Sequence, residues 1–397
     1  MIERVGILGG GQLGMMLAGS LFKCGIDVSL YDPDESAPAR RRYANVTTGA
    51  WTDREKLAAF AARCDVLTYE FENADPDTLA EIVGSTPVFP SLDVLRATQH
   101  RVREKRFCER AGLPHARFVA ATGRDELVAQ GRAFGFPFLV KTARGGYDGK
   151  GQHRITTPEE LTRVADGMAA ALGPGFEVVL EAIVPLELEA SCIVARSQSG
   201  EERVFPVFEN LHVAHVLDLT LVPARLDPET ASALTSIALE AARALDVVGL
   251  LTTEFFVAKA GSGTGGRRVG DRDVFVNEFA PRPHNSGHVT RSACNFSQFD
   301  AHARAIVGMP IGEPRLNGGG VYCMGNLLGD LWVERGEASL DFSAWARHPE
   351  VVDILLYGKR EARPGRKMGH FVACAEDAET VLAAARAFRR DLVGRRA

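Results

Sequence analysis

The sequence predicts a protein of mixed fold class, with an α/β domain at its N-terminus followed by regions of the α+β type. Its 397 residues exceed an average domain of about 150 residues, so two or three domains with buried cores are expected. Short apolar runs alternate with helical periodicity near the N-terminus, which is the pattern of a parallel sheet covered by helices. A hydrophobic fraction of 46% and a charged fraction of 24% match ordinary globular proteins and exclude wholesale disorder.

Charge and cysteine content exclude several classes of protein. The 46 lysines and arginines are outnumbered by 51 acidic residues, and the basic stripe typical of nucleic-acid or anionic-membrane binding is missing from the sequence. Seven scattered cysteines without a CxxC pair argue against a disulfide framework or structural zinc and fit a reducing compartment. No stretch approaches the roughly 18 apolar residues of a membrane span. We therefore expect a cytoplasmic protein that binds neither nucleic acid nor membrane.

The N-terminal elements follow the order strand, helix, strand, helix, strand. Gly25 is placed to end the first helix, and Thr52 to cap the second. Short links between such elements imply parallel strands joined by right-handed crossovers. The expected half-Rossmann unit consists of strands over 5–8, 26–31 and 66–69 and helices over 13–23 and 53–63.

The rest of the chain predicts helices that alternate with longer strands. Helical periodicity covers 99–111, 126–134, 158–172, 230–245 and 376–390, and apolar or alternating runs favour strands over 137–142, 176–182, 188–196, 203–208, 250–258 and 273–279. The glycine-rich stretch from Gly261 to Gly266 is typical of a flexible hairpin tip between the last two strands.

A glycine motif follows the first strand. Gly9, Gly11 and Gly14 form GxGxxG at the start of a helix, and Asp32 ends the next strand. This is the fingerprint of dinucleotide binding, in which the helix N-terminus attracts a phosphate. A tight strand-to-helix turn without any ligand has the same pattern, so an NAD(P)-dependent oxidoreductase remains one alternative.

A second glycine-rich segment, from Gly145 to Gln152, is more informative. It follows a strand that ends in Lys141, where a cation can be held rigidly against phosphate oxygens. Four glycines in seven positions let the backbone approach those oxygens and donate N–H groups. The segment lacks the order of a P-loop, but it predicts a nucleotide phosphate site rather than an exposed hairpin loop.

Two glutamates lie on the strands around the glycine-rich tip. If these strands form one hairpin centred on residue 266, Glu254 and Glu278 lie directly opposite each other, with Cβ atoms about 4.5–5.5 Å apart. The surrounding residues are apolar, and uncompensated acids in such a place are costly. A solvated pair of acids is the alternative, but two carboxylates at this spacing suit Mg²⁺.

Two further segments carry polar and basic side chains. The loop after Glu278 contains Arg282, His284, Asn285 and His288 between prolines, which is poor core material and suits substrate anchoring. Basic residues gather again between 359 and 370. They form either a solvated turn or an anion cradle for a sugar phosphate, and the sequence favours neither.

The strand-ending lysine, the glycine loop and the carboxylate pair ending in Asn-Glu resemble the ATP-grasp superfamily. Longer motifs, spread in order over nearly the whole chain, are similar to those of the N5-carboxyaminoimidazole ribonucleotide synthetase family of purine biosynthesis. A formate-dependent glycinamide ribonucleotide transformylase is the related alternative. The motifs are GGGQLG at 9–14, TYEFEN at 68–73, RGGYDGKGQ at 144–152, NEFAPRPHNSGH at 277–288 and RPGRKMGH at 363–370.

The resemblance implies three domains and a reaction. The N-terminal half-Rossmann (pre-ATP-grasp) domain would cover 1–98, an ATP-grasp domain 99–310 with a lid subdomain at about 115–184, and a small β-rich domain 311–397. ATP, bicarbonate and 5-aminoimidazole ribonucleotide would give ADP, phosphate and N5-carboxyaminoimidazole ribonucleotide through carboxyphosphate. ATP and Mg²⁺ are the expected ligands besides the substrates, and a homodimer is the expected assembly. Whether the amine captures the activated carboxyl or released CO₂ stays open.

The resemblance also implies residue roles. A hinge over 181–184 would recognise adenine, Glu189 would bind the ribose, and Glu254 and Glu278 would hold Mg²⁺. The expected nucleotide contacts are Arg101, Lys141, Gly146, Tyr147, Asp148, Gly149, Lys150, Gly151, Gln152, Glu181, Ala182, Ile183, Val184, Glu189, His212, Asn277 and Glu278.

The ribonucleotide and bicarbonate would meet on another set of residues. Asp148 would orient or deprotonate the amine, and Arg282 would stabilise carboxyphosphate. Glu70 and Glu72 both follow the third strand, and we favour Glu72 as the substrate contact. The expected substrate contacts are Gln12, Leu13, Glu72, Lys359, Arg366 and Lys367, and the expected catalytic residues are Tyr147, Asp148, Arg282, His284, Asn285 and Lys359.

Overall fold

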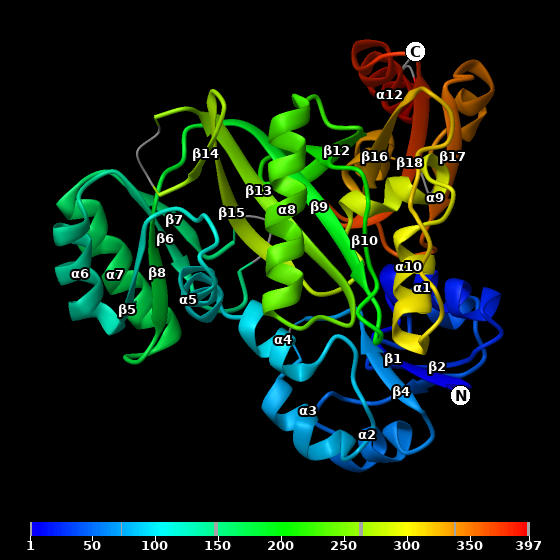
Figure 1. The fold of residues 1–397 in the computed structure, drawn as a ribbon, viewed down its shortest axis with the longest axis horizontal. Coiled ribbons are helices and arrows are strands. Elements are labelled where there is room, and N and C mark those ends of the chain that lie inside the picture. The colour runs from blue at the N-terminus through cyan, green and yellow to red at the C-terminus, as the bar shows by residue number, and fades with distance from the viewer. Residues whose placement is uncertain (1, 73, 147–149, 262–264, 337–338, 395–397) are drawn as a thin grey trace.

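A computed structural model describes residues 2–72, 74–146, 150–261, 265–336 and 339–394 and arranges them as three sheets with helices packed against them. In Figure 1 the N-terminal sheet lies at the bottom and the small sheet with α6 and α7 at the left, and the long central sheet extends from beside the small sheet to the C-terminal strands at the upper right. Within these ranges no helix is both long and apolar enough to cross a membrane.

The N-terminal sheet confirms the predicted half-Rossmann unit. Its four strands are parallel in the order β3-β2-β1-β4, and helices connect them. The bounds are β1 Arg4–Leu8, α1 Gln12–Lys23, β2 Asp27–Asp32, β3 Val46–Thr48, α2 Arg54–Ala61, β4 Val66–Tyr69, α3 Pro76–Val83 and α4 Leu92–Thr98, with a 3₁₀ turn at Pro38–Arg41.

The prediction of Thr52 as the cap of α2 is wrong by one residue. Asp53 is the N-cap, and its carboxylate accepts the N–H of Lys56 at 3.1 Å. Both residue types cap helices well, and here the carboxylate occupies the position that reaches the free N–H groups. Strand β3 and helices α3 and α4, the last of them capped by Ser91, were not predicted.

The small sheet forms a separate layer beside the central one. Its antiparallel strands run β5-β8-β6-β7, and α6 and α7 pack together beside it. Apolar residues from the strands and both helices form its core, which includes Leu127, Phe138, Leu161 and Leu180. The bounds are β5 Phe118–Thr122, α6 Gly123–Phe134, β6 Phe138–Thr142, β7 Gln152–Ile155, α7 Pro158–Leu172 and β8 Glu177–Ala182.

The central sheet joins the middle of the chain to its C-terminal part. Its path is β14-β15-β13-β9-β11-β12-β16-β18-β17, with β10 paired to β9. Because β12 pairs with β16, the C-terminal strands extend the same sheet. Its strands are β9 Leu186–Arg196, β10 Glu202–Val204, β11 Phe208–Val213, β12 Val216–Val222, β13 Gly249–Lys259, β14 Arg267–Val269, β15 Arg272–Ala280, β16 Val321–Leu328, β17 Val351–Leu356 and β18 Lys367–Ala375.

Helices cover both faces of the central sheet. One face packs on α8, where Leu234 and Ile237 meet Phe255 and Val257, and the other packs on α10, which also contacts α1. This shared helix fixes the N-terminal domain against the central sheet. The remaining helices are α5 Arg101–Ala111, α8 Pro228–Ala244, α9 Thr290–Ala293, α10 Gln298–Val307, α11 Asp330–Arg335 and α12 Ala378–Val393, with 3₁₀ turns η2 at Ser286–Val289 and η3 at Phe342–Arg347.

The strand predicted over 203–208 is wrong. The structure has β10 and the separate β11 there, because Pro206 lies between them and lacks the N–H that a continuous strand needs. Strand β12 follows without having been predicted. Part of the predicted tip from Gly261 to Gly266 lies outside the described residues, and β14 returns from it to pair with β15.

Candidate active site

A cleft of about 740 Å³ lies between the small sheet and the central sheet. Its walls come from β6, β8 and the glycine loop on one side and from β9, β11, β13 and β15 on the other. The N-terminal domain contributes Glu72, and the C-terminal strands contribute Lys367. Segments far apart in the sequence therefore meet at one site, as expected for a catalytic cleft.

Arg101 on α5 fixes the glycine loop at the cleft. Its guanidinium donates to the carbonyl oxygen of Thr142 at 2.9 Å and to that of Gly146 at 2.8 Å. Lys141, at the end of β6, lines the cleft together with Gly146, Lys150, Gly151 and Gln152. The predicted residues Tyr147, Asp148 and Gly149 lie outside the described residues.

Glu181 lies buried between two lysines. Its carboxylate contacts Lys105 Nζ at 2.7 Å and also pairs with Lys141. Burial alone would raise the pKa of Glu181, but the two lysines outweigh it and lower the pKa to about 2. The carboxylate is therefore charged at any working pH. Lys105 was not predicted as a site residue, although it lies one helical turn from Arg101.

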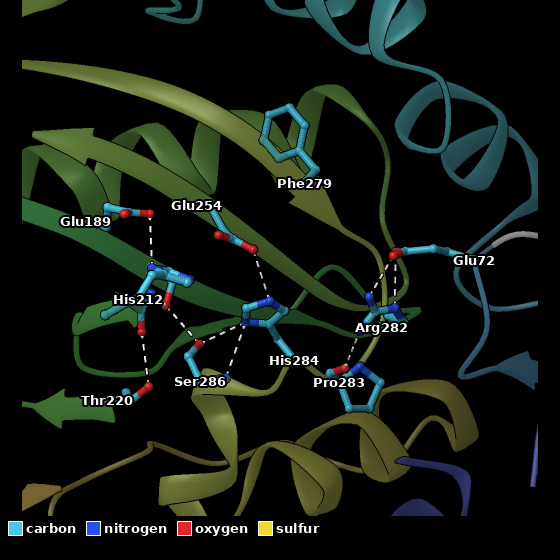
Figure 2. A network of polar contacts seen from close by, with 12 residues as sticks. Glu72, Glu189, His212, Thr220, Glu254, Phe279, Arg282, Pro283, His284 and Ser286 are labelled. Carbon is cyan, nitrogen blue, oxygen red and sulfur yellow. Dashed lines mark hydrogen bonds and ion pairs between the residues drawn. The ribbon is translucent and has the colours of Figure 1, made fainter. Parts of the chain in front are cut away.

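The far end of the cleft carries the predicted hinge. Ala182, Ile183 and Val184 follow Glu181 at the end of β8, and all three line the cleft. Glu189 on β9 contacts His212 on β11, with 3.2 Å between Oε2 and Nδ1 (Figure 2). Burial works against the charge of His212, but Glu189 outweighs it and raises the pKa of the imidazole.

The register of β13 and β15 confirms that Glu254 and Glu278 are direct partners. A β-bulge follows, since Phe255 pairs with Val276 and leaves Asn277 as the additional residue. The bulge shifts the alternation of β15, so that the consecutive residues Asn277 and Glu278 both line the cleft. Val276 packs in the core under α8, and Phe279 packs in that core and also borders the cleft.

The two carboxylates are unequal. Burial and the charge of Glu254 raise the pKa of Glu278 to about 7. Burial acts in the same direction on Glu254, but His284 outweighs it and lowers the pKa of Glu254. His284 Nε2 lies 3.0 Å from Oε1 of Glu254 (Figure 2). One acid of the pair therefore has an imidazole partner that lowers its pKa, and the other is destabilised in its charged form by the neighbouring carboxylate.

A divalent cation fits this pair. No cluster of three or more acidic, histidine or cysteine ligands occurs in the described residues, but Mg²⁺ usually takes one or two carboxylates and completes its shell with water and substrate phosphates. The repulsion between Glu254 and Glu278 is the imbalance that such a cation would remove.

The loop after β15 brings three predicted residues to the cleft. Arg282 donates two hydrogen bonds to Glu72, at 2.7 and 3.0 Å (Figure 2), so this pair joins the loop to the N-terminal domain. His284 is held by Ser286, whose hydroxyl lies 2.9 Å from Nδ1. Asn285 is 9% exposed and lines the cleft, yet neither its amide nitrogen nor its amide oxygen has a hydrogen-bond partner in the part of the chain that the structure describes. An unpaired buried amide beside a cleft indicates a ligand contact.

Three comparisons with known proteins agree with this geometry. Family profiles match residues 2–99 as a ribonucleotide synthetase preATP-grasp domain, residues 106–299 as an ATP-grasp domain, and residues 323–384 as a phosphoribosylaminoimidazole carboxylase C-terminal domain. N5-carboxyaminoimidazole ribonucleotide synthase of Brucella melitensis is 37% identical over 93% of this chain and 95% of that protein. The chain belongs to the N5-carboxyaminoimidazole ribonucleotide synthase family.

Solved structures of this family have the same fold. An ADP complex of an N5-carboxyaminoimidazole ribonucleotide synthetase matches with a TM-score of 0.85 and 35% identity, over 97% of this chain and 96% of that one. The Aspergillus clavatus synthase, in complex with ADP and 5-aminoimidazole ribonucleotide, matches with a TM-score of 0.82 and 27% identity over 99% and 98% of the two chains. The chain is thus an ATP-grasp ligase of purine biosynthesis, and the predicted fold class is confirmed. The exact domain boundaries stay a prediction.

In this synthase family member, Glu70 and Glu72 have different partners, and Glu72 is the one that reaches the cleft. Glu70 accepts the N–H groups of Gly11 and Gly14, so a carboxylate of the chain itself occupies the N–H groups on which the dinucleotide alternative depended. Glu72 lines the cleft, whereas Gln12 and Leu13 begin α1 and are not among the described residues that line it.

One of the three predicted C-terminal basic residues reaches the synthase cleft. Lys367 lines the cleft, and Lys359 and Arg366 do not. Burial, followed by the charge of Arg366, lowers the pKa of Lys359 to about 8. A cation held among other cations is what an anion cradle requires. The structure therefore places the three predicted basic residues in one electrostatic cluster.

Two charged residues of α5, Glu104 and Lys105, were not predicted from the sequence. Glu104 lines the cleft and accepts the N–H of Phe279 at 2.7 Å. Burial and the charge of Glu278 raise its pKa to about 8. Lys105 donates to the carbonyl of Asn277 at 3.0 Å. Their spacing from Arg101, three and four residues along one helix, is the only signal that could have indicated them.

Proposed function

We propose that this chain uses ATP to carboxylate 5-aminoimidazole ribonucleotide with bicarbonate, forming N5-carboxyaminoimidazole ribonucleotide, ADP and phosphate in the cleft described above. One observation carries the proposal. A strand-ending lysine, a glycine loop, a repelling carboxylate pair and the loop of Arg282 and Asn285 all meet in one space of about 740 Å³.

ATP would lie along the small sheet. Backbone groups of the hinge from Glu181 to Val184 would bind the adenine edge, and Glu189, beside His212, would accept from the ribose hydroxyls. Lys141 and the N–H groups of the glycine loop would bind the phosphates, with Arg101 holding that loop in place. The described members of this predicted set all line the cleft, and Tyr147, Asp148 and Gly149 belong to the proposal by their place in the loop.

Mg²⁺ would be held by Glu254 and Glu278, next to the γ-phosphate. When bound, it neutralises charge that develops on the transferring phosphoryl group. Asn277 and Lys141, which also line the cleft, would complete the polar surroundings of the phosphates.

The ribonucleotide would approach from the N-terminal and C-terminal domains. Glu72 lies at the cleft and would orient the amine end, while Gln12 and Leu13 would contact the ribose phosphate from the start of α1. Lys359, Arg366 and Lys367 would bind its phosphate. A dianionic phosphate would stabilise the charged form of Lys359, whose pKa is depressed by burial and by its basic neighbours.

In the reaction, a bicarbonate oxygen would attack the γ-phosphorus, and ADP would leave, giving carboxyphosphate. The amine nitrogen would then bond to the carboxyl carbon, phosphate would leave, and the nitrogen would lose a proton. Arg282, fixed by Glu72, would stabilise the anionic intermediate, and the free amide of Asn285 would bind its oxygens. His284 and Tyr147 would orient the reactants, Lys359 would assist at the substrate phosphate, and Asp148 would accept the proton.

We further propose a homodimeric, cytoplasmic enzyme. The homodimer follows from the family resemblance. The cytoplasmic location is supported by seven scattered cysteines that form no disulfide between described residues.

The test is phosphate release from ATP and Mg²⁺ at controlled bicarbonate, with and without 5-aminoimidazole ribonucleotide. Strong stimulation by the ribonucleotide, with N5-carboxyaminoimidazole ribonucleotide found as product, supports the proposal. A folded sample that binds ADP but shows no stimulation contradicts the substrate assignment. Glycinamide ribonucleotide with formate is the matched control, because a transformylase would respond to that pair instead.

A further inference from the structure

Helix α5 lies between the two walls of the cleft and contacts both. From its first turn, Arg101 holds the carbonyl groups of Thr142 and Gly146 beside the glycine loop. One turn later, the ammonium group of Lys105 lies 2.7 Å from the Glu181 carboxylate on β8 and donates to the Asn277 carbonyl on β15 at 3.0 Å. Lys105 is therefore a buried cation that joins the small sheet to the strand carrying Glu278.

The Lys105 side chain is more deeply buried than that of Lys141. The two side chains are 3% and 11% exposed, and both pair with the Glu181 carboxylate, which is 2% exposed. Lys141 lines the cleft, whereas Lys105 is not among the described residues that line it. Of the two lysines that pair with Glu181, Lys141 is therefore the one whose ammonium group can reach a ligand in the cleft.

A buried carboxylate needs a permanent counter-ion. Removing the partner of a buried charge is strongly destabilising because the remaining charge is uncompensated. If Lys141 were the sole partner of Glu181, a nucleotide could bind Lys141 only by breaking an internal ion pair. With Lys105 present, Glu181 stays neutralised while Lys141 interacts with phosphate.

We propose that Lys105 is a positioning residue for nucleotide binding: it serves as the permanent counter-ion of Glu181 and so leaves the ammonium group of Lys141 available to the phosphates. This inference rests on the proposed placement of ATP along β6 and β8. Lys105 itself contacts no substrate. It acts through Glu181 on Lys141, and through the Asn277 carbonyl it fixes the bulged end of β15.

The charges around Lys105 fit a permanent role. Burial alone would lower its pKa, but Glu181 and Glu104 outweigh burial and raise it, so the lysine is charged throughout the working range. Its second hydrogen bond, to Asn277, would be lost if it moved. Among the described residues, the backbone of Lys141 pairs with its neighbours on β7 and β8, and its ammonium group pairs with Glu181.

The experiment is a calorimetric titration of the full-length protein with ADP in the presence of Mg²⁺ and, separately, with adenosine. We expect Lys105→Met to weaken ADP binding at least about tenfold, the loss of one charge-assisted contact, and to leave adenosine binding within about threefold of the wild type. A general loosening of the cleft would weaken both ligands alike and would overturn the proposal.

The decisive variant is the double substitution Lys105→Met with Glu181→Gln. Since it removes the charge that captures Lys141, it should bind ADP more tightly than Lys105→Met alone. Replacing both members of a buried ion pair is also better tolerated than removing one. The proposal is overturned if the double variant binds ADP no more tightly than Lys105→Met. It is also overturned if the ADP affinity of Lys105→Met lies within threefold of the wild type. If Lys105→Met does not fold, Lys105→Gln, which keeps a donor for Asn277, makes the same comparison.

Arg389→Met supplies the matched control. Arg389 pairs with Asp218 at 2.9 Å. The pair is partly buried and neither residue lines the cleft, so the variant loses an ion pair without touching the nucleotide. Its ADP affinity should equal that of the wild type. Because these titrations contain no ribonucleotide, a wild type that binds ADP but does not carboxylate would contradict the proposed function and leave the role of Lys105 intact.

Discussion

Glu181 and Glu278 face the same cleft from opposite walls, and their electrostatic surroundings are opposite. Glu181 lies between two lysines, and its pKa falls to about 2. Glu278 lies across from another glutamate, and burial together with that neighbour raises its pKa to about 7. The first carboxylate is balanced by the chain itself and holds the structure together. The second is left unbalanced, which is the state of a group that functions with an added cation.

The largest expected effect comes from Glu278→Gln. Removing this carboxylate should lower ribonucleotide-stimulated phosphate release at least about 10³-fold, or 4 kcal/mol, because charge stabilisation by the bound metal is lost. Thermal stability without metal should not fall, since a repelling charge has been removed. Glu240→Gln, which changes an exposed acid paired with Arg267, is the matched control. A Glu278→Gln enzyme that retains a tenth or more of wild-type activity would contradict the assignment of Glu278 as a metal ligand.

Glu181→Gln should behave in the opposite way. It leaves two buried lysines without their counter-ion, so we expect the free energy of unfolding to drop by about 3 kcal/mol in urea denaturation. If Glu181→Gln is as stable as Glu278→Gln, the distinction between a balanced and an unbalanced carboxylate is lost.

Asn285→Ala tests a side chain that has no hydrogen-bond partner among the described residues. Its buried amide atoms are unpaired, so truncation should cost little stability while it lowers kcat for carboxylation by about 30-fold, near 2 kcal/mol. Melting temperature and steady-state kinetics measured on one preparation separate the two effects. A variant that loses several degrees of melting temperature but keeps its kcat would show a structural role instead.

The smallest effect is a dependence of stability on pH. The folded-state pKa of Glu278, about 7, lies above its ordinary value, so the folded protein retains a proton that the unfolded chain releases. This contribution to stability is full below about pH 4.5 and is lost as the pH rises through 7, by at most about 1.4 kcal/mol per pH unit. Buried His302 and His370, whose pKa values are lowered to about 3, act in the opposite direction. The contribution of Glu278 is therefore the difference in the free energy of unfolding between the wild type and Glu278→Gln, measured without metal at each pH. If the two curves of free energy against pH are parallel, this prediction is contradicted.

The part of the site that follows from strand counting could be predicted from the sequence. Glu254 and Glu278 are equidistant from one turn, and a hairpin centred on that turn places such residues opposite each other. The observed register reaches this pair through the bulge at Asn277, which counting does not show. The half-Rossmann order follows in the same way from short links between strands and helices. These are local properties of the chain.

The charge balance of the site could not be predicted, because it depends on contacts between distant segments. Lys105 meets the carbonyl of a residue 172 positions away, and nothing in the sequence of α5 shows which strand it faces. Glu70 and Glu72 are two residues apart, yet one binds the glycine turn of α1 and the other binds Arg282. Only the tertiary arrangement of three domains decides which of them reaches the cleft.

The β-bulge at Asn277 has a consequence for insertions and deletions. The additional residue shifts the alternation of β15 by one position. Side chains before the bulge and side chains after it therefore alternate between the two faces of the sheet out of phase with each other. Deleting Asn277 would turn Glu278 towards the hydrophobic core or move Phe279 out of it. The length of β15 at this point is therefore as constrained as the identity of its residues, and a single-codon deletion here should be as damaging as the loss of the carboxylate itself.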